Sequence, residues 1–155
     1  MKTNIKLTLV LFATIGLFAF ASLEKETREN NAGEQGIQFF EGSFEEALAK
    51  AKKNDQLIFI DVYATWCGPC KRLSKMVFVD DEVGEKFNGL FINYKMDSDQ
   101  ERYKEYMQTY HIRSLPTLLF VNGEGDVVHR SIGLIDKTEL NAFADRAIKK
   151  HEKHK

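Results

Sequence analysis

The stretch from Leu57 to Cys70, LIFIDVYATWCGPC, carries the features that decide the fold of this chain. Its first seven residues are nearly all apolar and β-prone, which is typical of a central strand covered on both faces. Its last five, Trp66 to Cys70, include the only two cysteines of the sequence. Because a helical pattern follows from Lys71, two thiols three positions apart lie close enough to bond, and the helix dipole stabilises a thiolate on the first. This spacing predicts a reversible dithiol/disulfide pair.

Length and composition fit a single globular domain. The 155 residues allow a sizeable core, and 43% hydrophobic with 29% charged residues is an ordinary balance. The formal charge of −1 and the absence of a basic stripe interleaved with aromatics argue against nucleic-acid binding. Two cysteines are too few for a disulfide-built scaffold.

Residues 1–21 have the pattern of a secretory signal peptide. Two lysines precede an apolar run at 7–20, and Ala19-Phe20-Ala21 offers a small-x-small cleavage site. The run is short for a membrane span, which needs about 20 apolar residues, so an uncleaved N-terminal anchor is the alternative. Cleavage would leave 20 basic and 23 acidic residues, a formal charge of −3. We expect an exported protein, periplasmic in a bacterium, whose cysteines meet an oxidising environment.

Four segments follow from the composition along the chain. After the signal peptide, residues 22–36 are charged and poor in apolar side chains, which predicts a flexible leader. Residues 37–150 carry the periodic apolar patterns of one folded domain. Residues 151–155 form a basic segment that we expect to be a solvated tail.

The patterns within 37–150 predict an α/β domain. Strands are expected at 37–40, 57–63, 90–96, 115–121 and 127–130, and helices at 43–53, 71–77, 80–87, 99–110 and 136–149. Ser43 and Glu46 form a capping-box signature at the first helix. The order β-α-β-α-β-α-β-β-α implies parallel pairing through the helical crossovers. A hairpin at Asn122 to Gly125 adds an antiparallel edge, so we expect a central mixed sheet flanked by helices.

This pattern resembles the thioredoxin superfamily over about residues 37–150. Four features carry the resemblance: the WCGPCK run at 66–71, Asp61 six positions before the first cysteine, Leu115-Pro116-Thr117, and Gly133 after the hairpin. A CxxC motif alone is a modest signal, whereas the combination is specific. The resemblance implies a thioredoxin fold and catalysis of thiol–disulfide exchange.

Within the superfamily, the chain is most similar to exported thioredoxin-like domains, such as the soluble domain of bacterial membrane thiol reductases. The run from Met76 to Val83 is the reason, because it predicts a cysteine helix, a short break and a second helix before the next strand.

The resemblance implies catalytic roles for three residues. Cys67 would be the nucleophile, nearer the solvent at the helix start, and Cys70 would resolve the mixed disulfide. Asp61 would be a buried acid that accepts the proton of Cys70, although a strand-end residue reaching solvent is the ordinary interpretation. The family often pairs this acid with a lysine on the next strand. Counting along that strand reaches Asn93, with Lys95 two residues on, so the partner stays open.

Six further residues would bind the substrate. Trp66 would cover the site, and Gly68 with Pro69 would tune the redox potential. A cis bond before Pro116 would bring Leu115 beside the cysteines, where its backbone can pair with an extended substrate. A proline that merely starts a strand is the simpler interpretation. Gly133 matches the family's glycine near the active site.

Other interpretations of the cysteine pair are weaker. A structural bridge would close too small a loop to restrict the unfolded chain much. A zinc site needs four ligands, yet no second cysteine pair exists and the histidines are isolated or in the tail. We therefore expect no metal and no cofactor.

The sequence thus predicts an exported thiol–disulfide oxidoreductase that most simply reduces disulfides in client proteins. Its electrons would come from a membrane thiol carrier. The alternatives are a disulfide oxidase or isomerase on the same fold, and a non-catalytic module that senses redox state or binds clients as a chaperone does.

Overall fold

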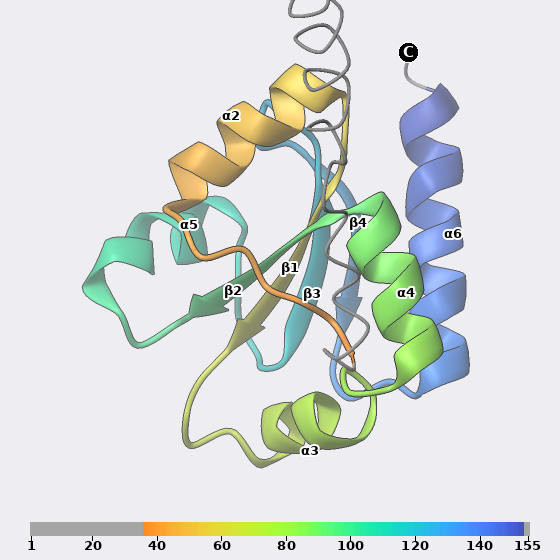
Figure 1. Cartoon of the computed structure of the whole chain (residues 1–155). Coiled ribbons are helices and arrows are strands. Elements are labelled where there is room, and N and C mark those ends of the chain that lie inside the picture. The colour runs from red at the N-terminus through yellow and green to blue at the C-terminus, as the bar shows by residue number, and fades with distance from the viewer. Residues whose placement is uncertain (1–35, 154–155) are drawn as a thin grey trace, which may run out of the picture. The chain divides into compact units, whose positions relative to one another are not determined.

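The computed structural model describes residues 36–153, which lie within one compact unit spanning Glu34–Lys155. The expected signal peptide and all but the last residue of the expected leader lie outside the described residues. Figure 1 shows a twisted sheet with helices on both sides. The helices are α2 (Phe44–Asn54), α3 (Gly68–Met76), α4 (Asp81–Leu90), the 3₁₀ turn η1 (Glu101–Tyr103), α5 (Lys104–Thr109) and α6 (Lys137–Lys153). The strands are β1 (Ile58–Tyr63), β2 (Ile92–Asp97), β3 (Thr117–Val121) and β4 (Val127–Ile132).

The sheet is mixed, with strand order β2-β1-β3-β4. β1 pairs in parallel with β2 and antiparallel with β3, and β4 joins the far edge antiparallel to β3. The expected α/β class, with a central mixed sheet flanked by helices, is confirmed.

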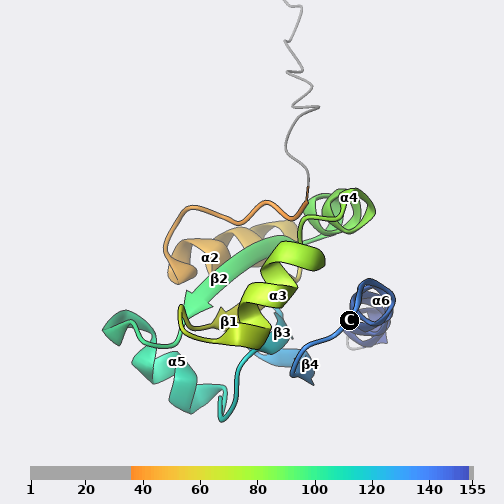
Figure 2. The same ribbon diagram turned by 90° about the horizontal axis from the view of Figure 1, so that it is seen from below.

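Strand β1 is buried on both faces because each face meets its own layer of helices. Phe59 points into one hydrophobic cluster together with Leu73 of α3, Phe87 of α4 and residues of α6. Ile60 points into the other cluster with Phe44 of α2 and residues around η1 and α5. Since side chains alternate along a strand, Asp61 lies on the same face as Phe59, the face covered by α3. The cysteine helix and the acid therefore lie on the same side of the sheet. Figure 2 shows α3 lying across β1.

The strand expected at residues 37–40 does not form. One backbone bond joins this segment to β2, from the Phe40 N–H to the Asn93 carbonyl at 2.8 Å. The Ile37 N–H donates to the Phe78 carbonyl at 2.6 Å, but Gln38 bonds to side chains: Asn93 Nδ2 donates to its carbonyl at 3.0 Å, and Asn88 Oδ1 accepts from its N–H at 2.8 Å. Because asparagine side chains replace ladder bonds, the segment runs along β2 without strand pairing.

The folded part includes one residue that was expected in the leader. Gly36, placed in the leader from its composition, is buried and accepts a hydrogen bond from Asn88 Nδ2 at 3.0 Å. Its φ of +89° and a Cβ position only 2.2 Å from the Phe78 carbonyl oxygen exclude a larger side chain.

The C-terminal helix runs further than expected. Helix α6 continues to Lys153, so the first three residues of the expected basic tail are helical. The reason is the pattern on its buried face, where His151 lies four positions after the buried Ala147. His151 Nε2 approaches Asp55 Oδ1 at 3.4 Å, and its side chain is only 20% exposed.

The remaining helices follow their sequence signals. The Ser43–Glu46 capping box is confirmed, with reciprocal bonds of 3.1 and 2.7 Å. The cysteine helix, the break and the second helix are all present as α3 and α4, while the helix expected at 99–110 forms as η1 and the short α5. Within the described residues, no helix is long and apolar enough to cross a membrane.

Substitution of Phe59 tests how much the side chains of β1 contribute to the stability of the core. Its ring contacts those of Phe78, Phe87 and Phe120 at centroid distances of 5.9, 4.8 and 5.3 Å. Phe59→Ala should lower the free energy of unfolding by about 3–5 kcal/mol, because it removes these contacts and leaves a cavity. Urea denaturation followed by circular dichroism measures the loss.

Two further variants control this experiment. Phe59→Leu should lose roughly half as much, because it refills part of the space. Val79→Ala, at a site that is 51% exposed, should change stability by less than about 0.5 kcal/mol. A loss below about 1 kcal/mol for Phe59→Ala would contradict the central place of this cluster.

Candidate functional site

The two cysteines lie at the junction between β1 and α3, and they form a disulfide. Their Sγ atoms are 2.03 Å apart and their Cα atoms 5.3 Å apart. Cys67 is the N-cap of α3, with Pro69 in the first turn, and its Sγ accepts the Cys70 N–H at 3.2 Å. An N-cap position places a sulfur where unpaired N–H groups and the helix dipole stabilise negative charge. On reduction, this end of α3 favours a thiolate at Cys67.

The expected difference in exposure between the cysteines is absent in the disulfide. Cys67 is 4% and Cys70 3% exposed, and both pack with Ala64, Tyr63 and Leu115. The first cysteine is therefore distinguished by its N-cap position and not by its exposure. By contrast, the neighbouring Trp66 is 68% exposed, so the surface around the pair is open even though the sulfurs are enclosed.

The loop before β3 lies against the cysteines, as the resemblance implied. The Leu115-Pro116 peptide bond is cis, and Leu115 packs on the cysteine cluster. The Gly133 N–H donates to the Pro116 carbonyl at 2.9 Å, with Gly133 at a φ of +94°, so the loop after β4 is joined to the same corner. Within residues 36–153, neither the N–H nor the C=O of Leu115 has a hydrogen-bond partner. A strand-like segment from another chain could pair with these groups.

Asp61 lies on β1 beneath the cysteine helix and is only 1% exposed. It is not the solvent-reaching strand end that was the ordinary interpretation. Lys95 Nζ lies 2.8 Å from Asp61 Oδ2, whereas Asp61 Oδ1 is buried and has no hydrogen-bond partner among the described residues. Burial raises the pKa of Asp61 above its ordinary value, and the nearby Lys95 charge only partly opposes this. The free Oδ1 is the atom on which a proton can be held.

The lysine partner left open by the sequence is Lys95. The parallel register places Lys95 of β2 directly beside Asp61 of β1, while Asn93 lies beside Phe59. Lys95 Nζ also donates to Ser74 Oγ of α3 at 3.3 Å and lies over the Tyr63 ring at 4.5 Å. The rings of Phe39 and Phe78 lie 4.9 and 5.7 Å from the same nitrogen. These contacts hold the ammonium group against the acid.

Asp99 is a site residue that the sequence analysis missed. Its Oδ2 accepts the Trp66 indole N–H at 2.7 Å, and its own N–H donates to Asp97 Oδ1 at 3.1 Å. The signal that could have found it is the acid pair at the end of β2, Asp97 and Asp99, because polar groups at the carboxyl ends of parallel strands gather at one edge. This contact ties the exposed indole, next to Cys67 in the chain, to the residue two positions after β2.

Among the described residues, no three histidine, cysteine or acidic side chains come together as ligands. The alternative of a zinc site therefore finds no ligand set within residues 36–153.

Comparison with known proteins agrees with this geometry. The family described as thioredoxin-like domain matches residues 44–148. The chain is 30% identical to thioredoxin of Pseudomonas aeruginosa over 112 residues, which covers 72% of this chain and 95% of that protein. It is 31% identical to thioredoxin of Allochromatium vinosum, covering 70% and 94%.

A solved structure is also similar. It belongs to a Bacteroides thetaiotaomicron protein named as a candidate disulphide isomerase, with 45% identity and a TM-score of 0.66, covering 76% of this chain and 97% of that one.

The buried acid gives a pH-dependent stability prediction. Because the folded pKa of Asp61 lies above its ordinary value of 3.8, the wild type loses stability as the pH rises from there through the raised pKa. Asp61→Asn cannot ionise, so it should be more stable than wild type at pH 7, by roughly 1–3 kcal/mol. The gain should shrink towards zero below about pH 4. Urea denaturation of the oxidised proteins at several pH values measures it.

Glu152→Gln is the matched control. This residue is exposed on α6, so the substitution should change stability by less than about 0.5 kcal/mol at every pH. An Asp61→Asn protein that is less stable than wild type at pH 7 would show that the Lys95 attraction outweighs desolvation, contrary to the stated direction of the pKa.

Proposed function

The chain belongs to the thioredoxin-like domain family and is a thiol–disulfide oxidoreductase, and we propose that it reduces disulfides in exported client proteins. The observation that carries this proposal is the Cys67–Cys70 pair at the start of α3, above a buried acid. The Gly68-Pro69 dipeptide between the cysteines resembles that of reducing thioredoxins. Similarity to thioredoxins of two bacteria supports the same direction.

The reaction proceeds in two exchanges. The Cys67 thiolate attacks one sulfur of the client disulfide, forming a mixed disulfide and releasing the second client sulfur as a thiolate that takes a proton. Cys70 then loses its proton to the Asp61 carboxylate and attacks Cys67 Sγ. This step breaks the mixed disulfide, releases the first client sulfur, and leaves the Cys67–Cys70 disulfide. The client gains two electrons and the cysteine pair loses two.

Asp61 is suited to the second exchange because of its burial. A carboxyl with a raised pKa holds a proton more readily than an exposed one, and its Oδ1 has no other partner among the described residues. The Lys95 ammonium group partly compensates the negative charge of the ionised Asp61 carboxylate. The pair thus makes both protonation states of Asp61 accessible during a turnover.

Trp66 and Leu115 supply the client contacts. The unpaired backbone groups of Leu115 would bond to an extended client segment, and the exposed Trp66 ring offers apolar area beside it. Pro116 and Gly133 hold that loop in place through their backbone bond. Gly68 and Pro69 start α3 and set the approach to Cys67.

Isomerisation of client disulfides is the second candidate. The Bacteroides thetaiotaomicron neighbour, 45% identical, is named as a candidate disulphide isomerase. An isomerase uses the same attack by the first cysteine, but the client's own thiol resolves the mixed disulfide. The redox potential separates the two functions, because reducing thioredoxins lie near about −270 mV and disulfide isomerases near about −180 mV.

Export is the second part of the proposal. Residues 1–21 have the charge, the apolar run and the small-residue site of a signal peptide. A reductant outside the cytoplasm needs an electron source across the membrane, so a membrane thiol carrier would re-reduce the Cys67–Cys70 disulfide. The periplasm of a bacterium is the proposed compartment.

Insulin reduction tests catalysis and the assignment of the two cysteines. The wild type should accelerate reduction by dithiothreitol, whereas Cys67→Ser and Cys70→Ser should fall to the uncatalysed rate. Cys70→Ser should also accumulate a mixed disulfide with insulin through Cys67, because the resolving thiol is missing; Cys67→Ser should not. Turbidity and non-reducing mass spectrometry provide the two readouts.

The direction of the reaction depends on the potential measured for the same wild type against glutathione. A value below about −230 mV supports reduction. A value above about −180 mV would contradict it and favour the isomerase or oxidase function. Equal activity of wild type and both serine variants would contradict catalysis by this pair.

Expression of the full chain in a Gram-negative host tests export. The periplasmic fraction should contain a protein whose N-terminus is Ser22, shown by intact-mass spectrometry. Ala19→Arg with Ala21→Arg should block cleavage and leave the chain on the membrane. A wild type that keeps Met1 on the membrane supports the uncleaved anchor, and one that stays in the cytoplasm contradicts export.

A further inference from the structure

Helix α3 carries a positive face that begins next to the disulfide. Lys71, Arg72 and Lys75 are exposed, and the helix contains no acidic residue. Lys71 and Lys75 follow Cys67 by four and eight positions, so they lie on the helix face that starts at this sulfur. At about 1.5 Å per residue, they lie about 6 and 12 Å along the helix axis from it. We call Lys71, Arg72 and Lys75 the α3 cations.

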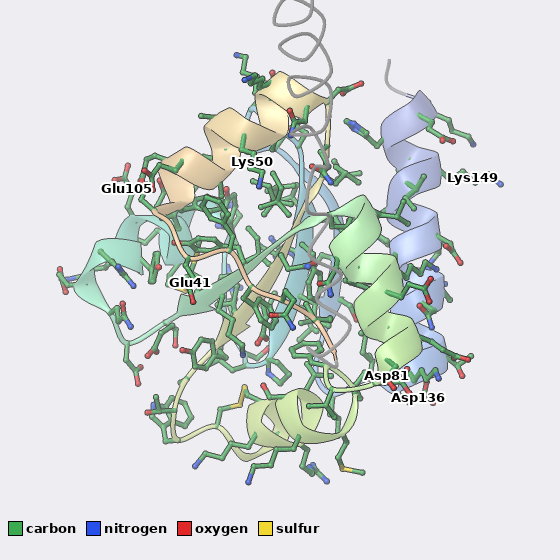
Figure 3. The ribbon with its side chains drawn as sticks, viewed as in Figure 1. Glu41, Lys50, Asp81, Glu105, Asp136 and Lys149 are labelled. Atoms are coloured by element: carbon green, nitrogen blue, oxygen red, sulfur yellow. A yellow bond between two sulfur atoms is a disulfide. The ribbon has the colours of Figure 1, made fainter. Side chains whose placement is uncertain are left out.

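None of the α3 cations has an acidic partner among the described residues, whereas five lysines elsewhere have one. Within residues 36–153, no ion pair forms at any of the three. Lysines that do have acidic partners are Lys52 with Glu124, Lys86 with Asp145, Lys95 with Asp61, Lys104 with Glu101, and Lys137 with Asp80. Figure 3 shows nitrogen-tipped side chains on α3 that point away from the sheet.

The charge of the whole chain does not explain this face. The formal net charge is −1, so the three cations stand out against a slightly acidic protein. Three acids follow α3 in the chain, Asp80, Asp81 and Glu82, and Lys137 binds two of them, Asp80 and Glu82. A charged partner at the disulfide meets Lys71 within about one screening length, 8–10 Å at physiological salt, and Lys75 just beyond it.

Apolar contact area borders the cations on the same helix. Trp66, just before α3, is 68% exposed, and Met76, four positions after Arg72, is 72% exposed. A partner whose sulfur bonds to Cys67 would contact Trp66, the residue next to it in the chain. A lipid surface bound here would cover Cys67 and Cys70 and would offer them no disulfide to reduce. A polypeptide therefore suits this surface better than a membrane.

We propose that the α3 cations select client proteins whose disulfides are flanked by acidic residues. This inference rests on the proposed reduction of client disulfides and names the class of client. The cations attract the client before bond formation and hold it while Cys67 exchanges with its disulfide, so their effect is on the rate of encounter and binding.

Three peptides test the proposal. They share one intramolecular disulfide and differ only in the two residues on each side of it, which are Glu, Gln or Lys. The protein is reduced first, and stopped-flow fluorescence of Trp66, the only tryptophan of the chain, follows one turnover. At low ionic strength, the wild type should reduce the Glu peptide about three- to tenfold faster than the Lys peptide. The ratio should approach one in about 0.5 M salt.

Charge reversal localises the effect. In the triple variant K71E/R72E/K75E, the order of the Glu and Lys peptides should reverse. The change also acts on the Cys67 thiolate, but this alters the rates for all peptides alike, so the ratio of two peptide rates isolates the client's charge. The matched control is K53E/K149E/K153E, with the same change in net charge at exposed positions on α2 and α6. It should keep the wild-type order, and Figure 3 shows Lys149 far from α3.

Each other outcome overturns a defined statement. If the wild type reduces all three peptides at equal rates, the client preference is wrong while the reductase function stands. If it reduces none faster than Cys67→Ser does, the proposed function itself is wrong. If the control variant also reverses the order, net charge and not α3 causes the preference. If the α3 cations bind vesicles of phosphatidylglycerol and phosphatidylcholine without any peptide preference, the surface is a membrane contact and the proposal is wrong.

Discussion

Burial of β1 between two helical layers is the constraint on which the fold and the site both depend. Its side chains alternate into two separate hydrophobic clusters, so neither face can reach water. Asp61 lies within this strand, on the face that α3 covers, so its carboxylate is desolvated. The strand ends at Tyr63, and α3 begins at Gly68, which leaves Cys67 at the helix start, on the acid's side of the sheet. One buried strand thus places both the redox sulfurs and the acid.

The electrostatics of the site follow from parallel pairing. β2 lies beside β1 in a register that puts Lys95 next to Asp61, and no other described cation bonds to this acid. Desolvation dominates the pKa of Asp61, and Lys95 moderates it without satisfying Oδ1. Ser74 and three aromatic rings hold Lys95, so α3, β2 and the segment before α2 all meet at this nitrogen. The acid's proton affinity is therefore a property of several packed elements.

Prediction from sequence succeeded where a local signal was strong. The β1 run, the Ser43 capping box and the hairpin before β4 each follow from residues close in the chain. It failed at residues 37–40, because both backbone groups of Gln38 bond to side chains, those of Asn88 and Asn93, about 50 positions away. It also missed Asp99, whose partner Trp66 lies 33 residues earlier in the chain. Side-chain contacts between residues so far apart in the chain produce no periodic pattern in the sequence.

The sequence by itself determined the chemistry: a CxxC pair at a helix start, an acid in an apolar strand and an X-Pro-Thr motif identify the reacting groups and their family. Only the tertiary structure decided which residues surround these reacting groups. Lys95 and not Asn93 pairs with Asp61, the two sulfurs are equally enclosed, and the α3 cations form no ion pair with any described acid. The physical reason is that residue type and local spacing set what a group can do. Strand register and helix packing set its neighbours, its desolvation and hence its charge.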